Sequence, residues 1–149
     1  MTGVTHTDVN IKTMHAISVY LLRVEDLRDD KLNSILENEK TSFKIKHGDV
    51  KYTFLGEGIF ATTKIPKSKE WQSGKLICKI ETDYFGGFGD QSAKLYRDNT
   101  ILMNEDTRTD PVSNPINQAL KMMGVKAKPG MDEFDTVGLG RYRTNEDFK

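Results

Sequence analysis

The sequence has a single cysteine, Cys78, among its 149 residues. One thiol cannot form a disulfide within the chain, and it cannot supply the thiolates of a structural zinc site. Disulfides are typical of oxidising compartments. The sequence therefore fits a reducing compartment, and we expect a cytoplasmic location.

Long hydrophobic runs are also missing. No apolar stretch approaches the roughly 20 residues that a membrane-spanning helix needs, so we expect no membrane partner. The N-terminal stretch MTGVTHTDVNIKT lacks the apolar segment of a secretory signal. We interpret residues 1–13 as a polar, flexible arm in front of the folded part of the chain.

The chain has no net charge, because 22 lysines and arginines balance 22 aspartates and glutamates. Proteins that bind nucleic-acid duplexes normally carry a basic surplus, since phosphate neutralisation supplies most of their non-specific affinity. The balance therefore argues against a nucleic-acid partner, although it is compatible with a local basic patch.

What the sequence does have is a series of apolar patterns typical of strands. Residues 15–24 (HAISVYLLRV) are apolar on both faces, which predicts an interior strand. Residues 43–54 predict a hairpin, because apolar residues alternate on both sides of a His-Gly-Asp turn. Further strands are predicted over residues 59–61, 76–85, 92–97 and 100–103.

The clearest helix lies near the C-terminus. Asn114 can cap it, Pro115 fits the first helical position, and Gly124 is placed to end it. Its apolar positions repeat at helical spacing: Ile116, Ala119, Leu120 and Met123. Residues 132–137 predict one more helical turn, which Gly138 ends.

A shorter helical pattern follows the first predicted strand. Asp26 is placed to cap it, and a narrow apolar stripe comes after: Leu32, Ile35 and Leu36. We expect residues 14–149 to form a single α+β domain, because the chain has the length of one domain. Its predicted architecture is an antiparallel, meander-like β-sheet of about five to seven strands, with two or three helices packed mainly on one face.

The segment YFGGFGDQ, residues 84–91, is rich in glycine. A dinucleotide-binding turn would lead from a strand into a helix, whereas here a strand follows. The segment is either a glycine-bearing hairpin loop or a recognition loop with Phe88 as an exposed anchor. The second hypothesis gives these candidate binding residues: Asp83, Tyr84, Phe88, Asp90 and Gln91.

Arg141 and Arg143 are further candidate binding residues. They can bind a carboxylate or phosphate bidentately. The alternative, which we favour, is that they pair with nearby acids, as charge runs usually do. These acids are Asp132, Glu133 and Asp135. Together with the acids of residues 81–90, these three carboxylates would suit acid–base catalysis or Mg²⁺ binding. A position at the start of a predicted helix, where negative charge is favourable, is the better explanation for the three.

No set of residues matches a catalytic or metal-binding pattern. His6, His15 and His47 are far apart and have no metal-ligand spacing. Since His15 starts a buried element, we expect it to be a hydrogen-bonded core histidine. Cys78 lies on the apolar side of its predicted strand, where a buried structural thiol is expected. We therefore predict no catalytic residue, no metal and no cofactor.

Two segments of the second half of the chain carry a resemblance. They are YFGGFGDQSAKLY and NPINQALKMMGV…MDEFDTVGLGRYR. The pattern of a YFGGxGxQ loop followed by DEFDxxGLGRYR resembles small, uncharacterised bacterial cytosolic proteins. The resemblance implies a bacterial or bacteriophage intracellular origin and an intact C-terminus, and it implies no activity and no functional residues.

These observations make a non-catalytic protein-binding domain the leading hypothesis, with an immunity or antitoxin-type inhibitor as its specific form. Its partner would be a basic toxin or nuclease, because Asp83 and Asp90 flank the recognition loop. The alternative is a small-ligand-binding protein or enzyme with a pocket between the GGFGDQ loop and the C-terminal tail. That pocket would bring together four side chains: Asp83, Asp90, Arg141 and Arg143. A self-associating subunit, forming a homo-oligomer, is a third hypothesis.

Overall fold

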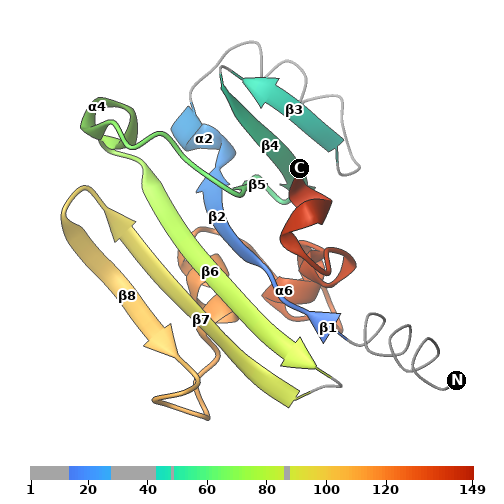
Figure 1. Ribbon diagram of the computed structural model, residues 1–149. Helices are drawn as coiled ribbons and strands as arrows, with labels where there is room; N and C mark the ends of the chain where they lie inside the picture. Colours follow the sequence, from blue (N-terminus) through green and yellow to red (C-terminus); the bar gives the residue numbers. More distant parts are fainter. Residues whose placement is uncertain (1–13, 28–42, 48, 86–87) are drawn as a thin grey trace, which may run out of the picture.

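The computed structural model describes residues 14–27, 43–47, 49–85 and 88–149. In these ranges eight β-strands form one sheet (Figure 1). The strands are β1 (Met14–His15), β2 (Ser18–Arg23), β3 (Phe43–His47), β4 (Val50–Gly56), β5 (Ile59–Thr62), β6 (Leu76–Phe85), β7 (Phe88–Arg97) and β8 (Thr100–Asp106). All their pairings are antiparallel, which confirms the predicted type of sheet.

The strands lie in the order β3-β4-β5-β2-β6-β7-β8. Strand β1 continues the line of β2 along the same edge of β6. The part formed by β6, β7 and β8 is the predicted meander, whereas β2 separates it from the hairpins of β3, β4 and β5. The sheet is therefore organised around β2 and β6.

Several strands differ from their predicted extents: β5 ends at Thr62 instead of residue 61, and β8 ends at Asp106 instead of residue 103. Strand β6 has the predicted bounds, but β7 begins at Phe88 instead of residue 92. The predicted strand over residues 15–24 is interrupted after His15, where the tail approaches it. The backbone N–H of Ala16 donates to the carbonyl of Arg143 at 2.8 Å, and Ala16 forms a parallel bridge with Thr144.

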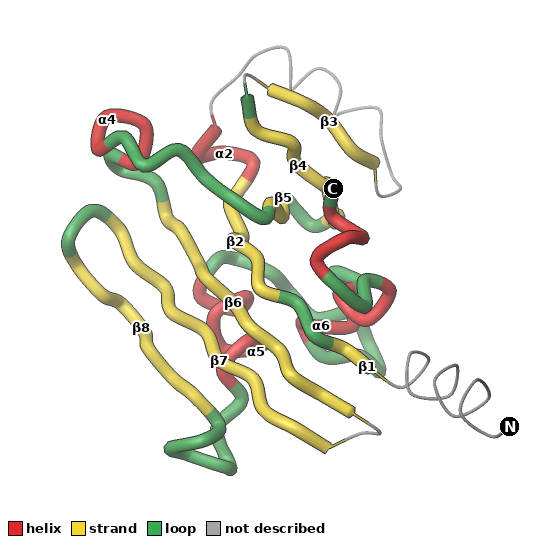
Figure 2. Tube along the Cα trace, viewed as in Figure 1, coloured by secondary structure: helices red, strands yellow, loops and turns green. Residues whose placement is uncertain are grey.

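Helical segments gather on one face of the sheet, as predicted (Figures 1 and 2). The helices are α2 (Val24–Leu27), α4 (Lys69–Gln72), α5 (Pro115–Met122) and α6 (Glu133–Thr136), and the 3₁₀ turns are η1 (Leu139–Arg141) and η2 (Asn145–Phe148). Of these, α5, α6 and the two 3₁₀ turns cover the face. Gly124 and Gly138 follow the ends of α5 and α6 with φ of 97° and 71°, as their sequences predict.

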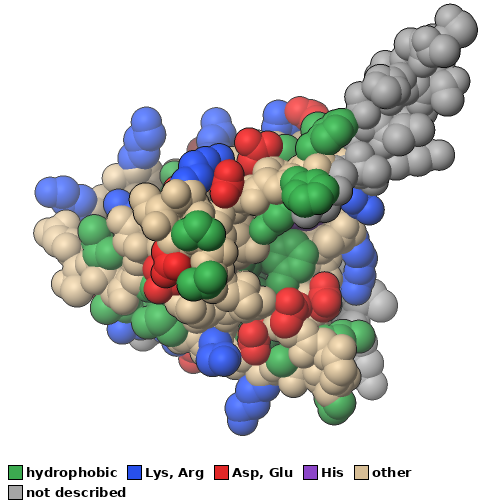
Figure 3. Space-filling view, turned by 90° about the horizontal axis from the view of Figure 1, so that it is seen from below, with side chains coloured by type: hydrophobic (Ala, Val, Ile, Leu, Met, Phe, Trp, Pro, Cys, Tyr) green, Lys and Arg blue, Asp and Glu red, His purple; other side chains and the backbone are tan. Residues whose placement is uncertain are grey.

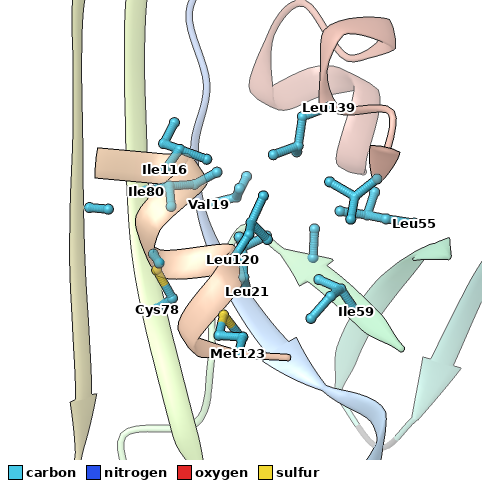
Figure 4. Packing of buried hydrophobic residues seen from close by; sticks show 14 of the residues in the cluster. Val19, Leu21, Leu55, Ile59, Cys78, Ile80, Ile116, Leu120, Met123 and Leu139 are labelled. Carbon is cyan, nitrogen blue, oxygen red and sulfur yellow. The ribbon is translucent and has the colours of Figure 1, made fainter. Parts of the chain in front are cut away.

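The main hydrophobic core lies between the sheet and these helices. Alternate residues of β2 and β6 point into it, because successive strand residues face opposite sides. Ile116 and Leu120 of α5 pack against them from the other side (Figure 4). The residues of β2 and β6 that are fully buried in this core are Val19, Leu21, Cys78 and Ile80. The C-terminal segment docks on this core, since Leu139 and Phe148 are buried in it.

A smaller apolar cluster covers part of the opposite face. It consists of Leu22, Tyr52, Phe54, Phe60 and Ile77. Ile65 and Trp71, from the segment between β5 and β6, pack against it. The rest of this side, which we call the open face, carries these side chains: Tyr20, Lys79, Glu81, Asp83, Asp90, Ser92, Lys94 and Tyr96.

Asp26 lies inside α2 and does not cap a longer helix within the described ranges. Its carboxylate accepts two hydrogen bonds from Arg23, at 2.8 and 3.0 Å, and one from the backbone N–H of Leu76 at 3.1 Å. The predicted apolar stripe at residues 32–36 and the predicted arm over residues 1–13 lie outside the described residues. No helix in the described part of the chain is long and apolar enough to cross a membrane.

Candidate functional site

The glycine-rich segment forms the end of the β6–β7 hairpin. The strands pair from Leu76↔Arg97 to Phe85↔Phe88, so Phe88 begins a strand and does not lie in a loop. Gly89 permits this pairing, because its φ is 152° and a Cβ there would lie 1.8 Å from the carbonyl oxygen of Asp83. The hairpin interpretation is therefore correct for the backbone, and residues 86–87 lie outside the described residues.

The hairpin ends in two exposed phenylalanines, Phe85 and Phe88, which we call the phenylalanine tip. They are register partners, and 53% and 84% of their surfaces are exposed. Cross-strand partners have Cβ atoms about 5 Å apart, so the two rings form one apolar surface. This supports the hypothesis that Phe88 is an exposed anchor.

An acidic surface lies beside the tip on the open face. We define it as Glu81, Asp83, Asp90 and Asp106 around Arg108. The guanidinium of Arg108 lies 3.8 Å from Asp83, 3.6 Å from Asp90 and 3.6 Å from Asp106. Glu81, Asp83, Asp90 and Arg108 share a shallow cavity of about 320 Å³. Because one guanidinium cannot neutralise four carboxylates, the surface keeps a negative charge.

The other side of the hairpin lines a pocket of about 330 Å³, which we call the polar pocket. Its walls come from β1, the hairpin, the start of α5 and the start of α6: His15, Tyr84, Gln91, Asn114, Asn117, Asp132 and Phe134. Figure 3 views the molecule from below, and hydrophobic and acidic side chains lie side by side on the face that it shows. Tyr84 and Gln91 face away from Asp83 and Asp90. The candidate residues of the hairpin are thus divided between two surfaces.

Gln91 fixes one wall of the polar pocket. Its Nε2 donates to Tyr84 Oη at 2.9 Å, and its Oε1 accepts from the backbone N–H of Ile116 at 3.0 Å. The first N–H groups of a helix have no partner within it, so Gln91 caps α5. Asn114 occupies the predicted N-cap position without a capping hydrogen bond, because its Oδ1 accepts from Asn117 Nδ2 at 3.1 Å.

Asn117 fixes the opposite wall. It is 8% exposed, its Nδ2 donates to Asp132 Oδ2 at 3.0 Å, and its Oδ1 accepts from the N–H of Phe134 at 2.7 Å. Asp132 also caps α6 by accepting from the N–H of Asp135 at 2.8 Å. These bonds give Asp132 a helix-starting role, in agreement with the interpretation favoured from the sequence.

His15 lines the same pocket with both ring nitrogens hydrogen-bonded. Its Nε2 lies 3.1 Å from the carbonyl oxygen of Leu139, and its Nδ1 lies 2.7 Å from Thr82 Oγ1. A carbonyl only accepts, so Nε2 carries a proton. Thr82 Oγ1 also lies 3.2 Å from the carbonyl oxygen of His15, to which it donates. His15 is therefore a hydrogen-bonded core histidine, as expected.

Arg141 and Arg143 line neither the polar pocket nor the cavity of the acidic surface. The Arg141 guanidinium packs over Gly138, where an added Cβ would lie 2.9 Å from its Nη2. The Arg143 Nη1 lies 3.5 Å from the carbonyl oxygen of Met14. Neither forms an ion pair with a described residue. No ion pair within the described ranges joins them to residues 132–135, and they do not line the cavity that contains Asp83 and Asp90.

The only thiol of the chain, Cys78, lies in the main hydrophobic core. Cys78 is fully buried, and burial raises the pKa of its thiol to about 12, so the thiol stays protonated at neutral pH. No group of three or more histidine, cysteine, aspartate or glutamate side chains in the described ranges could hold a metal ion. The buried structural thiol that the sequence predicts is confirmed.

Several residues of these surfaces carried no signal in the sequence. Arg108 lies in a turn after β8, and the polar pocket joins four segments that are far apart along the chain. Asn117 was also missed, although a buried amide on an otherwise apolar helix needs partners. Only the tertiary structure brings these groups together.

Comparisons of the chain with protein-family models, with curated proteins and with solved structures find no match. The resemblance of the second half to small bacterial cytosolic proteins therefore stays a prediction.

Proposed function

We propose that this protein is a non-catalytic binding domain that presents the phenylalanine tip to a partner protein. The observation that carries the proposal is the 84% exposure of Phe88, beside the 53% exposure of Phe85. Burying a phenylalanine side chain contributes about 1.5–3 kcal/mol. Aromatic anchors of this kind dominate the affinity of many interfaces.

The acidic surface supports a basic partner. Its carboxylates border the tip, and the side chain of Asp83 is 76% exposed. Complementary charge speeds association and fixes the orientation of a complex. A basic toxin or nuclease fits this chemistry, and an immunity or antitoxin-type inhibitor is the specific form of the proposal.

The test begins with capture of a partner from a lysate of the native host. The captured protein is then purified, and its affinity is measured by calorimetry for the wild type and for Phe88→Ala. We expect Phe88→Ala to weaken binding about thirtyfold, as loss of a strong anchor does. Its melting temperature should match that of the wild type, because the ring contributes little to the fold.

Met122→Ala is the matched control, since Met122 is a 51% exposed apolar residue at the C-terminal end of α5 and lines neither the polar pocket nor the cavity of the acidic surface. It should bind as the wild type does. Equal affinity of Phe88→Ala and the wild type would contradict the proposal. Light scattering addresses the self-association hypothesis: a wild-type oligomer that Phe88→Ala dissolves would assign the tip to contacts between copies of this chain.

The polar pocket favours a second candidate function, the binding of a small ligand. Its volume of about 330 Å³ lies at the lower end of the range of ligand pockets, and it lies between the hairpin and the C-terminal region. We expect a polar metabolite that fits it to raise the melting temperature of the wild type and of Phe88→Ala. Asn114→Ala should lose most of this shift. A metabolite screen without any shift would remove this candidate.

A further inference from the structure

One row of side chains crosses the open face of the sheet. Register pairs place Tyr20, Lys79, Lys94 and Asn104 side by side on β2, β6, β7 and β8. Tyr96 and Ile101 form the next pair towards the β7–β8 turn. The row lies on the open face together with the acidic surface, but away from the phenylalanine tip.

The two lysines of this row face each other without a carboxylate partner. Like charges directly opposite on neighbouring strands destabilise a sheet, and neither lysine forms an ion pair with a described residue. Burial lowers the pKa of Lys79, although Glu81 on the same strand acts in the opposite direction. An anion between the two ammonium groups would relieve their repulsion.

Two tyrosines hold the ammonium groups in place. The Nζ atom of Lys79 lies 4.2 Å from the ring centre of Tyr20, and that of Lys94 lies 5.9 Å from the ring centre of Tyr96. Burial, and then the proximity of Tyr20, raises the pKa of Tyr96. The hydroxyl of Tyr96 therefore stays protonated at neutral pH and is available as a donor.

These groups line a cavity of about 390 Å³, with Asp98, Asn99 and Ile101 at its end. Asp98 accepts from the backbone N–H of Gly74 at 3.0 Å, so a part of its hydrogen-bonding capacity is used inside the protein. Ile101 is 55% exposed and adds an apolar contact. A cavity of this size accommodates a small ligand and not a nucleic-acid duplex.

We propose that this cavity binds the phosphate group of a nucleotide-sized ligand. Lys79 and Lys94 hold the phosphate, and Tyr96 donates a hydrogen bond. The ring system of the ligand lies against Ile101. Two ammonium groups and a hydroxyl are suited to phosphate oxygens, while the apolar contact selects a ligand with a ring over free phosphate.

The test is a titration of the full-length chain by calorimetry and NMR, with inorganic phosphate, AMP and a short oligothymidylate as probes. We expect AMP to bind more tightly than phosphate. Lys79→Gln and Lys94→Gln should each weaken AMP binding about tenfold or more, as loss of a charged hydrogen bond does. Ile101→Ser should weaken AMP binding and leave phosphate binding unchanged.

Lys51→Gln is the matched control. Lys51 is exposed, and its register partner on the neighbouring strand is also a lysine, Lys46, but this pair lies outside the cavity. It should leave AMP binding unchanged. Without ligand, Lys94→Gln should melt at the wild-type temperature or above, since a repulsion is removed. Three results would each overturn the proposal: no binding of AMP at millimolar concentration, equal binding of phosphate and AMP, or binding of the oligothymidylate alone.

Discussion

Gln91 takes the place of an N-cap residue for Ile116: its side chain, 25 positions earlier in the chain, accepts the hydrogen bond of the Ile116 N–H at 3.0 Å. The residue at the N-cap position, Asn114, does not cap the helix, because its side-chain oxygen accepts a hydrogen bond from Asn117. The hairpin is thereby tied to the start of α5, so the orientation of the proposed binding surface depends on the helix that covers the core.

Replacing Gln91 by alanine should therefore destabilise the protein. An N–H of α5 would lose its partner, which costs about 1–2 kcal/mol. Chemical denaturation monitored by circular dichroism measures this loss. Gln91→Glu keeps the accepting oxygen and should retain more stability than Gln91→Ala, whereas equal losses would show that the cap contributes nothing.

Gly89→Ala should disrupt the end of the hairpin. A Cβ at this position would lie 1.8 Å from the carbonyl oxygen of Asp83, and the φ of 152° is unfavourable for alanine. We expect a loss of about 2 kcal/mol or more and faster amide exchange in the hairpin. Gly130→Ala is the control, because its φ is 77° but no atom lies within 4 Å of the added Cβ. A Gly89→Ala variant as stable as this control would contradict the structure.

Asp26→Ala should be among the most destabilising single substitutions of a polar residue. It would leave Nε and Nη2 of Arg23 and the N–H of Leu76 without their acceptor in a largely buried place, while Nη1 of Arg23 keeps its ion pair with Glu25. Removing one partner of such a pair costs about 3 kcal/mol or more. Thermal denaturation of Asp26→Ala and of the exposed control Asp110→Ala compares this loss with that of an ordinary surface carboxylate.

Stability should fall at alkaline pH. Burial raises the pKa of Cys78 from 9.0 and that of Tyr52 from 10.0, both to about 12. Because the pKa of each group is raised in the folded state, its contribution to stability is fully present at a pH below its pKa in the unfolded chain. It is lost as pH rises towards the folded value, at about 1.4 kcal/mol per pH unit for each group.

Melting temperatures between pH 8 and pH 12 measure this effect, with Cys78→Ala as the comparison. The variant should lose less stability between pH 9 and pH 12 than the wild type. A thiol reagent at pH 8 should react with Cys78 only after denaturant is added. Rapid reaction in the native protein would show that Cys78 is accessible, against its complete burial.

The strands were predictable where a pattern of side chains decided them. Strand β6 alternates from Cys78 to Asp83 and its bounds were correct, and α5 was correct because Pro115 and Gly124 mark its ends. The start of β7 was missed, since glycines usually signal a loop, whereas Gly89 here permits close pairing with Asp83 and Tyr84. Local patterns thus identify elements but not the backbone contacts that extend them.

The candidate sites were only partly predictable. Phe88 is exposed as the recognition hypothesis requires, and Asp83 lies with Asp90 as expected. The partner of these acids is Arg108 and not Arg141, because pairing across strands β7 and β8 decides which charges meet. Sequence proximity cannot supply that information when the groups come from different strands.

The bridge between Ala16 and Thr144 has a consequence for how the chain folds. The neighbouring bond from Ser18 to Asn145 spans 127 positions, so this contact gives the native topology a long-range component. Contacts of high sequence separation slow folding, because a large loop must close before they form. During synthesis on the ribosome, the contacts of Ala16 and Ser18 with residues 144–145 can form only after this later segment has been made.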